Sequence, residues 1–345
     1  MADKILKKSD LGRFLGSLAG LYQVLAPAPA GGRYKMQPAG EDYQLDFAAY
    51  RNTFLSPKDL FFPQSERMFE FTADPSREGA FLLRDVNLDP PARLVFGLRP
   101  CDAKAFYVLD RIFTNDQFSD PYWQNKREAT VLIGLACNEP GPTCFCSSVN
   151  SGPFHPDGLD ALAVDLGETL LFKPLTEKGI KALAAAQGLG DPKHKEDERA
   201  FALQAAAEAA IGREAPTGNI FRRSVMELFD AAHWDRWFES CINCGVCTFV
   251  CPTCHCFDIQ DEVAGADGDR VRNWDTCMSW LFTFHGSGHN PRPGKKERVR
   301  QRFMHKFKYI PLKRGGELGC VGCGRCVNLC PVNIDVRDVV RDMNA

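Results

Sequence analysis

Two short, fully apolar runs stand out in the first half of the chain. RLVFGL (93–98) and TVLIGLA (130–136) contain mainly aliphatic and β-branched residues, and each ends at a turn. Continuous apolar runs of this length are typical of strands that are buried on both faces of a sheet. A cysteine follows each run, Cys101 and Cys137 respectively, and a helix is expected across 103–113. The pattern predicts mixed α/β packing.

The N-terminal segment has helical rather than export-signal character. A helix is predicted from Asp10 to Leu25, and the PAP sequence that follows would end it. Arg13 and Gln23 interrupt the apolar positions, whereas the core of an export signal is continuously apolar. The chain contains no apolar window of about eighteen residues, the length needed for a transmembrane helix. A soluble, cytoplasmic protein is therefore expected, with no membrane span.

A change of composition near REAPTGNI (213–220) indicates a domain boundary. Alanine-rich helices are predicted before it, at 177–188 and 198–212. We predict a mixed α/β domain over 1–217, followed by a mainly α-helical domain over 218–345.

Three helices are predicted in the second domain. Apolar residues at helical spacing across 220–240 lead directly to Cys241. A basic helix at about 295–309 leads toward a second set of cysteines, and a last helix at 334–343 ends the chain.

The composition and net charge of the chain limit the kinds of ligand that it is expected to bind. The net charge of −2 argues against a broad nucleic-acid or membrane footprint. Fifteen cysteines are unusual, and an odd number at gaps of two and three residues favours metal or cluster ligation over disulfides.

The same cysteine spacing occurs twice. CINCGVCTFVCP (241–252) and CVGCGRCVNLCP (320–331) both follow the pattern C-x2-C-x2-C-x3-C-P. In ferredoxins that bind two clusters, three cysteines of such a run ligate one [4Fe–4S] cluster and the fourth ligates the other. Gly245, Gly322 and Gly324 would let the backbone approach the cluster. The predicted ligand sets are Cys241, Cys244, Cys247 and Cys330 for cluster 1, and Cys320, Cys323, Cys326 and Cys251 for cluster 2.

Zinc ribbons are the structural alternative, because they use paired C-x2-C units. Zinc would leave the third and fourth cysteines and the following prolines unexplained, so two iron–sulfur clusters are favoured. Cys251 and Cys320 stand 69 positions apart, farther than in compact β-ferredoxins, and helices are predicted before both motifs. This arrangement resembles the α-helical ferredoxin fold of iron–sulfur subunits in respiratory complexes and heterodisulfide reductases.

The remaining cysteines form two groups. Four thiols in the first domain would converge at one sheet edge if the two predicted strands are neighbours, and a third [4Fe–4S] cluster or another thiolate metal site competes there with simple packing. A second group near the motifs would either ligate a metal or pack around the clusters, and packing is preferred. The first group is Cys101, Cys137, Cys144 and Cys146, and the second is Cys254, Cys256 and Cys277.

Residues 292–314 hold ten Lys and Arg residues and one acid, Glu297. A solvated helix face is one interpretation. The other is that the positive charge offsets anionic clusters or docks an acidic redox partner.

Five motifs together resemble a known family along nearly the whole chain. They are GLRPCDAKAF, CNEPGPTCFC, CINCGVCTFVCPTCHCFD, RNWDTC and CVGCGRCVNLCP. The chain resembles the iron–sulfur subunit of anaerobic sulfite reductase and the iron–sulfur beta subunit of soluble [NiFe] sulfhydrogenases. The resemblance implies an electron-relay subunit without catalytic residues of its own. Its expected partners are a flavoprotein that oxidises NAD(P)H or ferredoxin and a separate catalytic subunit of the sulfite reductase or hydrogenase type.

Two classes of function remain open. The chain shows no G-x-G-x-x-G after a strand and no P-loop, so no nucleotide site is visible in it. An electron-transfer subunit of an anaerobic oxidoreductase complex fits this composition. The alternative is a self-contained reductase that acts on a small sulfur substrate at an N-terminal cluster or metal site.

Overall fold

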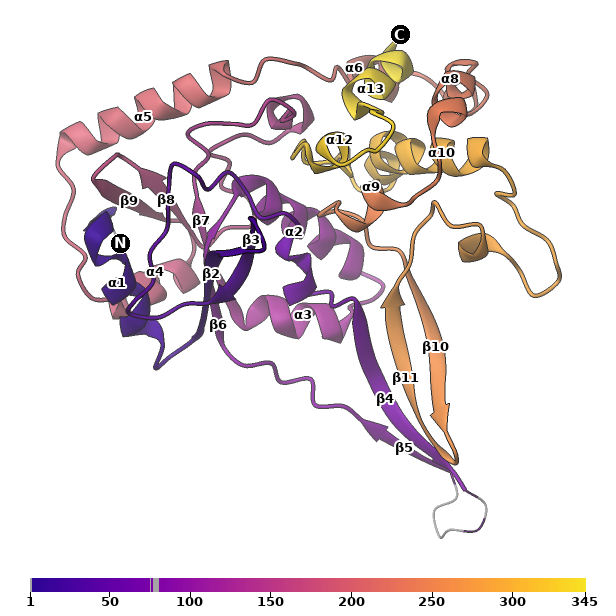
Figure 1. Ribbon diagram of the computed structural model, residues 1–345, viewed down its shortest axis with the longest axis horizontal. Coiled ribbons are helices and arrows are strands. Elements are labelled where there is room, and N and C mark those ends of the chain that lie inside the picture. The colour runs from indigo at the N-terminus through magenta and orange to yellow at the C-terminus, as the bar shows by residue number, and fades with distance from the viewer. Residues whose placement is uncertain (1, 75, 77–80) are drawn as a thin grey trace.

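The two apolar runs form neighbouring strands at the centre of a seven-stranded sheet. The computed structural model describes residues 2–74, 76 and 81–345, and in it β6 (Arg93–Leu98) and β7 (Thr130–Leu135) pair in parallel (Figure 1). The sheet order is β1-β9-β8-β7-β6-β2-β3, in which β2, β6, β7 and β8 are parallel. The other strands are β1 (Lys4–Lys7), β2 (Gln23–Ala30), β3 (Arg33–Pro38), β8 (Ala161–Asp165) and β9 (Thr169–Pro174).

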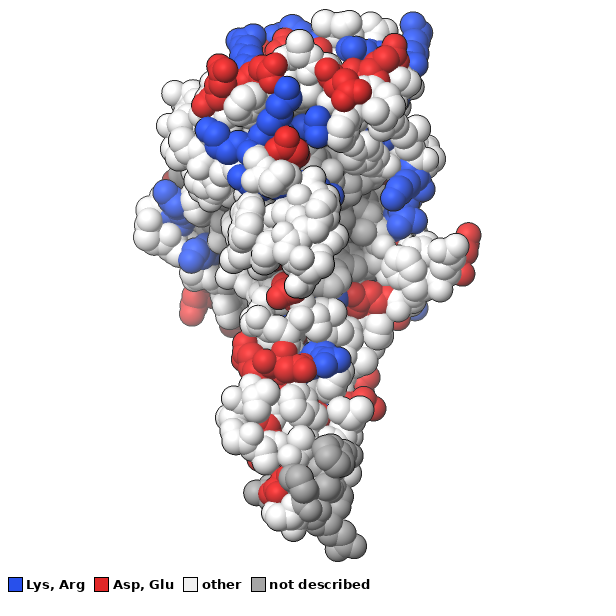
Figure 2. Space-filling model, turned by 90° about the vertical axis from the view of Figure 1, so that its right-hand side faces the viewer, with Lys and Arg blue, Asp and Glu red and all other residues white. Residues whose placement is uncertain are grey.

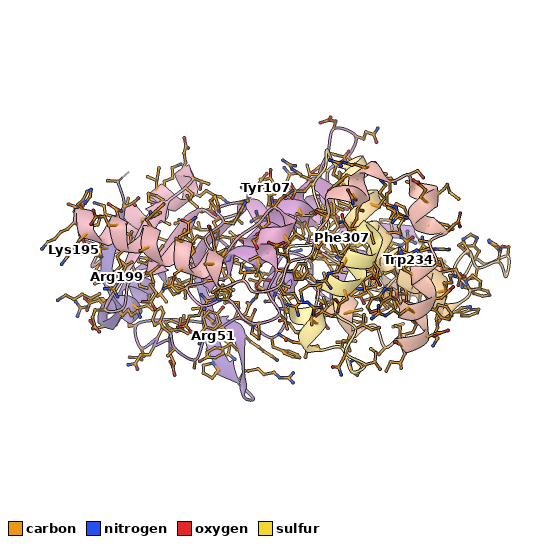
Figure 3. All side chains as sticks on the ribbon, turned by 90° about the horizontal axis from the view of Figure 1, so that it is seen from above. Arg51, Tyr107, Lys195, Arg199, Trp234 and Phe307 are labelled. Carbon is orange, nitrogen blue, oxygen red and sulfur yellow. The ribbon has the colours of Figure 1, made fainter. Side chains whose placement is uncertain are left out.

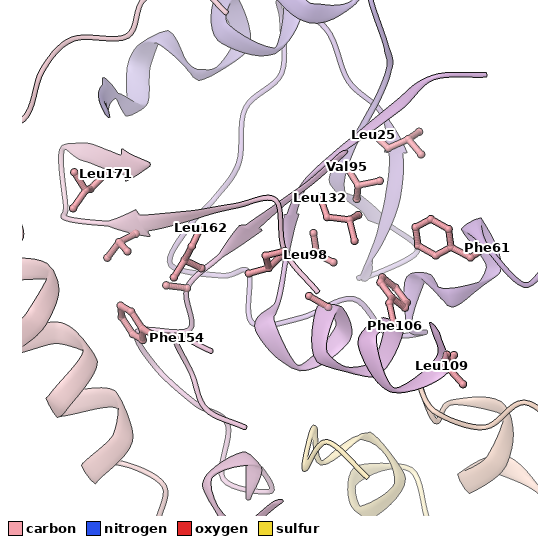
Figure 4. Packing of buried hydrophobic residues seen from close by; sticks show 14 of the residues in the cluster. Leu25, Phe61, Val95, Leu98, Phe106, Leu109, Leu132, Phe154, Leu162 and Leu171 are labelled. Atoms are coloured by element: carbon pink, nitrogen blue, oxygen red, sulfur yellow. The ribbon is translucent and has the colours of Figure 1, made fainter. Parts of the chain in front are cut away.

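Helices cover both faces of this sheet, so the side chains of β6 alternate between two buried clusters. Leu94 and Phe96 pack with α1 and α4 on one face, and Val95 and Leu98 pack with α2 and α3 on the other. Figure 4 shows the second face, with Phe106 of α2 beneath the sheet. Burial on both faces explains why the strands are uninterrupted apolar runs. The helices are α1 (Leu11–Leu18), α2 (Pro100–Phe113), α3 (Pro121–Glu128), α4 (Glu177–Ala185) and α5 (His194–Ala209).

The helix predicted from Asp10 to Leu25 is wrong beyond Leu18. The chain turns there and enters β2, which includes the PAP sequence. β6 pairs with β2 as far as Leu25, and Pro27 and Pro29 follow outside that ladder. Proline has no N–H to donate to a neighbouring strand, so it is tolerated where that hydrogen bond is not needed.

A four-stranded sheet projects from the molecule as an arm (Figures 1 and 2). Its order is β10-β11-β4-β5, so a hairpin from the second half of the chain pairs with a hairpin from the first half. The helical expectation between the two cysteine motifs is therefore wrong for this hairpin. Gly265, at φ +68°, lies in the two-residue turn that closes it. The strands are β4 (Ser65–Ala73), β5 (Phe81–Asp85), β10 (Phe257–Ala264) and β11 (Asp267–Trp274).

Arg272 of β11 anchors the arm to the first half of the chain. Its guanidinium forms ion pairs with Glu66 and Asp120, and only 2% of its side chain is exposed. It also lies over the rings of Phe62 and Phe113. The boundary predicted at residue 217 falls between α5 and α6 and stays a prediction.

The rest of the second half is helical and has its own buried cluster. Trp234 and Phe307 belong to this cluster and are labelled in Figure 3. The predicted basic helix is confirmed as α10, which continues into a π-helical turn at His305–Tyr309. The region 220–240 forms three short helices instead of one. The helices are α6 (Gly218–Arg222), α7 (Val225–Phe229), α8 (His233–Ser240), α9 (Val246–Phe249), α10 (Lys295–Met304), α11 (Ile310–Lys313), α12 (Arg325–Asn328) and α13 (Val336–Asn344).

Short 3-10 turns complete the elements: Lys8–Asp10, Pro57–Leu60, Cys146–Val149 and Leu281–Thr283. Among the described residues, no helix is long and apolar enough to cross a membrane.

Candidate cluster-binding sites

The two cysteine motifs fold locally in the same way. In each, a glycine after the second cysteine adopts a left-handed conformation, with φ +73° at both Gly245 and Gly324. Each glycine caps a helix of four residues, α9 and α12, and these two helices pack against one another. A side chain at Gly324 would place its Cβ 2.3 Å from Oγ1 of Thr143. The repeated spacing therefore specifies a repeated loop.

The first motif shares a cavity with the last cysteine of the second motif. Cys241, Cys244, Cys247 and Cys330, the predicted ligands of cluster 1, line it together with Cys326. Burial raises the pKa of Cys241, and the neighbouring thiols Cys244 and Cys330 add to the effect. The wall opposite the thiols is apolar and includes Phe303.

The second motif meets the last cysteine of the first. Burial raises the pKa of Cys320 to about 12, and Lys306 lowers it while Cys251 raises it. Burial also raises the pKa of Cys326, where Cys323, Cys320 and Cys251 act as neighbouring thiols. The four predicted ligands of cluster 2 are therefore mutual neighbours in the interior.

All four cysteines of the first domain line one cavity of about 260 Å³. Cys101 lies in the first turn of α2 after β6, and Cys137 follows β7, so the parallel strands bring them to one edge of the sheet. Cys144 and Cys146 reach the same cavity from the following loop. Burial raises the pKa of Cys144 to about 11 and that of Cys146 to about 12.

The second motif forms one wall of this N-terminal cavity. Cys323 lines it together with Gly322, whose carbonyl accepts a hydrogen bond of 2.9 Å from the backbone N–H of Phe145. A Cβ on Gly322 would lie 2.5 Å from the backbone nitrogen of Cys146. Because Cys326 lines the other cavity, the predicted ligands of cluster 2 lie between the two cavities.

A buried ion pair joins these two parts of the chain. Arg325, between Cys323 and Cys326, donates two hydrogen bonds of 2.8 Å to the carboxylate of Asp102. Asn52 accepts a further bond from the same guanidinium. Both charged side chains are almost fully buried, and Asp102 follows Cys101 directly.

Two buried cations lie among the motif thiols. Burial would lower the pKa of Arg302, but the surrounding Cys247, Cys254 and Cys251 outweigh it and raise it. The ammonium of Lys306 donates to Oγ1 of Thr253 at 2.8 Å and to the carbonyl of Gly319 at 2.9 Å. The side chains on this part of the basic segment thus point inward, toward the predicted ligands.

The three surplus cysteines lie next to the predicted ligands. The thiol of Cys254 hydrogen-bonds to Cys251 and lowers its pKa, and Arg302 approaches the same Cys254 sulfur at 3.5 Å. Cys277 lowers the pKa of Cys256 in the same way. Their role as metal ligands or as packing stays a prediction.

Among the described residues, no three His, Cys, Asp or Glu side chains converge as the ligands of a single metal ion would. The cysteines instead surround cavities. Soft thiolate donors in sets of four around a space fit a cubane cluster. The cluster 1 thiols and the four thiols of the first domain each line such a space, whereas the cluster 2 thiols are neighbours that line no common cavity within the described part of the chain.

Comparisons with known proteins agree with the motif analysis. Residues 240–334 match the family described as the 4Fe-4S dicluster domain. The chain carries a 4Fe-4S dicluster domain. Over 341 residues, the whole chain is 28% identical to sulfhydrogenase 2 subunit beta of Pyrococcus furiosus, with 95% of each protein covered. The predicted resemblance to sulfhydrogenase beta subunits is confirmed. No significant match to a solved structure was found.

Sequence reasoning missed several residues around the dicluster domain. The Arg325–Asp102 pair joins positions 223 apart, so no local pattern could reveal it. The sequence around Lys58 did not indicate a role for it either, although its ammonium donates a hydrogen bond of 2.7 Å to the carbonyl of Cys254. For the basic segment, charge that offsets anionic clusters is one of the interpretations that the sequence leaves open, and the sequence does not indicate that Arg302 and Lys306 lie beside the thiols.

Proposed function

We propose that this protein is the electron-transfer iron–sulfur subunit of an oxidoreductase complex. The observation that carries the proposal is the position of the second motif, which presents Cys323 to one cavity and Cys326 to the other. Three thiol sets therefore lie in series, from the N-terminal cavity through the cluster 2 ligands to the cluster 1 ligands.

Each set would hold one [4Fe–4S] cluster, and these clusters supply one-electron redox chemistry when bound. The sets are Cys241, Cys244, Cys247 and Cys330 for cluster 1, Cys320, Cys323, Cys326 and Cys251 for cluster 2, and Cys101, Cys137, Cys144 and Cys146 for the third.

The surrounding residues tune and shield the sites. Arg302 and Lys306 place positive charge beside thiolates, which favours the more negative, reduced form of a cluster. Phe303, Val299 and Met278 give the first-motif cavity an apolar wall on its buried side. Arg325 and Asp102 hold the second motif against the first domain.

The exposed end of the series is a suitable place for a redox partner. Cys244 is exposed, and Ile242 and Phe249 beside it have exposed fractions of 59% and 41%. The similar sulfhydrogenase protein is named as a subunit. We propose a flavoprotein that oxidises NAD(P)H or ferredoxin and a catalytic subunit of the hydrogenase or sulfite reductase type as partners, in the cytoplasm of an anaerobic cell.

A second candidate function is a reductase of a small sulfur substrate at the N-terminal cavity. Arg51 and Arg99 line that cavity with the four thiols and would attract an anion.

Anaerobic purification of the tagged chain from its native cell tests both candidate functions, the electron-transfer subunit and the reductase. The relay predicts that a flavoprotein and a catalytic subunit co-purify, and that the isolated chain exchanges electrons with a low-potential dye but turns over neither sulfite nor polysulfide. Turnover by the isolated chain would refute the relay and support the reductase.

A further inference from the structure

A cavity of about 630 Å³ lies on the helical half of the molecule, apart from the thiol-lined cavities. The C-terminal end of α10, the π-helical turn and α11 form most of its wall. Its volume falls in the usual range for a site that binds a small organic molecule, roughly 300–1,000 Å³.

The cavity carries positive charge without a counter-ion. Arg292, Lys313 and Arg314 line it, and its wall contains no Asp or Glu among the described residues. Within the part of the chain that the structure covers, none of these three cations forms an ion pair with a protein carboxylate. Burial chiefly lowers the pKa of His305 to about 3, and Lys306, Arg292 and Lys313 add to the effect as nearby positive charges. Such a cavity attracts a multiply charged anion.

Rings and apolar side chains form the rest of the wall. His305 and Tyr309 both line it from the π-helical turn, and the rings of His255 and His305 are 5.5 Å apart. Ile310 adds an aliphatic surface. π-Helical turns are rare and occur frequently at functional sites, because they displace side chains from the regular helical face. The wall therefore suits a flat aromatic body as well as an anionic group.

The cavity lies close to the predicted cluster 2. His255 stands between Cys254 and Cys256, and Lys306, next to His305, hydrogen-bonds to Thr253 and Gly319. A ligand in the cavity would thus lie against the segments that present Cys251 and Cys320.

We propose that this cavity binds a phosphate ester that carries a flat aromatic ring system, the chemical class of the mononucleotides. The phosphate would lie among Arg292, Lys313 and Arg314, where charge-assisted hydrogen bonds are strongest. The aromatic body would lie against Tyr309 and His305. The inference does not depend on the electron-relay proposal, since binding can be measured without redox turnover.

Calorimetric titration of the cluster-loaded full chain with FMN, AMP and inorganic phosphate tests the proposal. At least one nucleotide is expected to bind well below about 1 mM, and at least tenfold more tightly than phosphate. Binding of FMN alone would identify a redox ligand, and binding of AMP would identify a non-redox one; both support the site.

The variant Lys313→Ala/Arg314→Ala is expected to weaken nucleotide binding at least tenfold. Lys195→Ala, on the exposed face of α5, is the matched control and should change nothing. Arg292→Gln serves as an independent second variant if the double variant loses its cluster absorbance. Absence of nucleotide binding, equal binding of phosphate, or undiminished binding to the variants would overturn the proposal.

Discussion

Cys330 lines the cavity of the first motif although it belongs to the second, and Cys251 lies among the thiols of the second although it belongs to the first. At the scale of single residues, this exchange decides how the two sites depend on one another. In the crossed assignment, each motif supplies three of its four thiols to its own site, and the fourth ligand of that site comes from the other motif.

Double variants test the exchange. Cys251→Ala is expected to remove one cluster, about four iron atoms, and adding Cys320→Ala should remove no more because both thiols serve the same cluster. Combining Cys251→Ala with Cys241→Ala should remove about eight. Iron analysis and EPR of the reduced proteins measure this, and the reverse pattern would show that each motif keeps its own fourth cysteine.

Arg302 allows a test of cluster tuning. Arg302→Met removes a buried positive charge beside the thiols, so the reduction potential of a neighbouring cluster should fall by on the order of tens of millivolts. Arg300→Met, on the same helix but with a half-buried guanidinium over Phe229, is the control. An EPR-monitored potentiometric titration compares them; equal potentials in both variants would rule out this role of Arg302.

The motif ligand sets are predictions that the sequence allows because ligand spacing is local and chemically specific. From the sequence, Cys101 and Cys137 are expected to meet only if the two apolar runs are neighbouring strands, and the parallel pairing of β6 with β7 meets that condition. The partners of these sets could not be predicted. Arg325 meets Asp102, and Lys58 meets Cys254, only through tertiary packing.

At the scale of elements, the arm was the main feature that sequence reasoning missed. β10 is exposed along most of its length, so it lacks the apolar alternation of a half-buried strand. Its pairing depends on β11, and the attachment of β11 depends on β4 and on Arg272. The N-terminal helix was overextended for a related reason, because β2 gains its strand conformation from pairing with β3 and β6.

The attachment of the arm can be measured by substitution. Arg272→Met leaves Asp120 without its buried cation and Glu66 with Lys126 alone, and should lower the free energy of unfolding by up to about 3–5 kcal/mol. Arg270→Met breaks an exposed pair with Asp261 and a contact with the ring of Phe69, and should cost about 1 kcal/mol. Urea denaturation of both full-length variants gives the comparison, and similar midpoints would contradict an anchoring role.

At the scale of the whole molecule, the two halves of the chain are joined at several places. β11 pairs with β4, Arg325 pairs with Asp102, and the loop of Phe145 lies against Gly322. The amino-acid composition therefore changes at the predicted boundary at residue 217, but several structural contacts cross it.

A fragment of residues 218–345 tests that boundary. Produced alone, it would leave Arg325 without Asp102 and Asn52, its partners in the first half of the chain, and β11 without β4. We expect it to hold fewer than about eight iron atoms, and co-expression with residues 1–217 to restore them. A soluble fragment that holds about eight iron atoms by itself would show that the second domain is independent.

The central claim is that three thiol sets in series hold three clusters. Iron and acid-labile sulfide per chain, measured on anaerobically purified wild-type protein and on the Cys137→Ala/Cys146→Ala variant, test it most directly. Three clusters require about twelve of each in the wild type, and the variant should hold about eight. About eight in both proteins would contradict the third site, and zinc in place of iron would contradict the relay altogether.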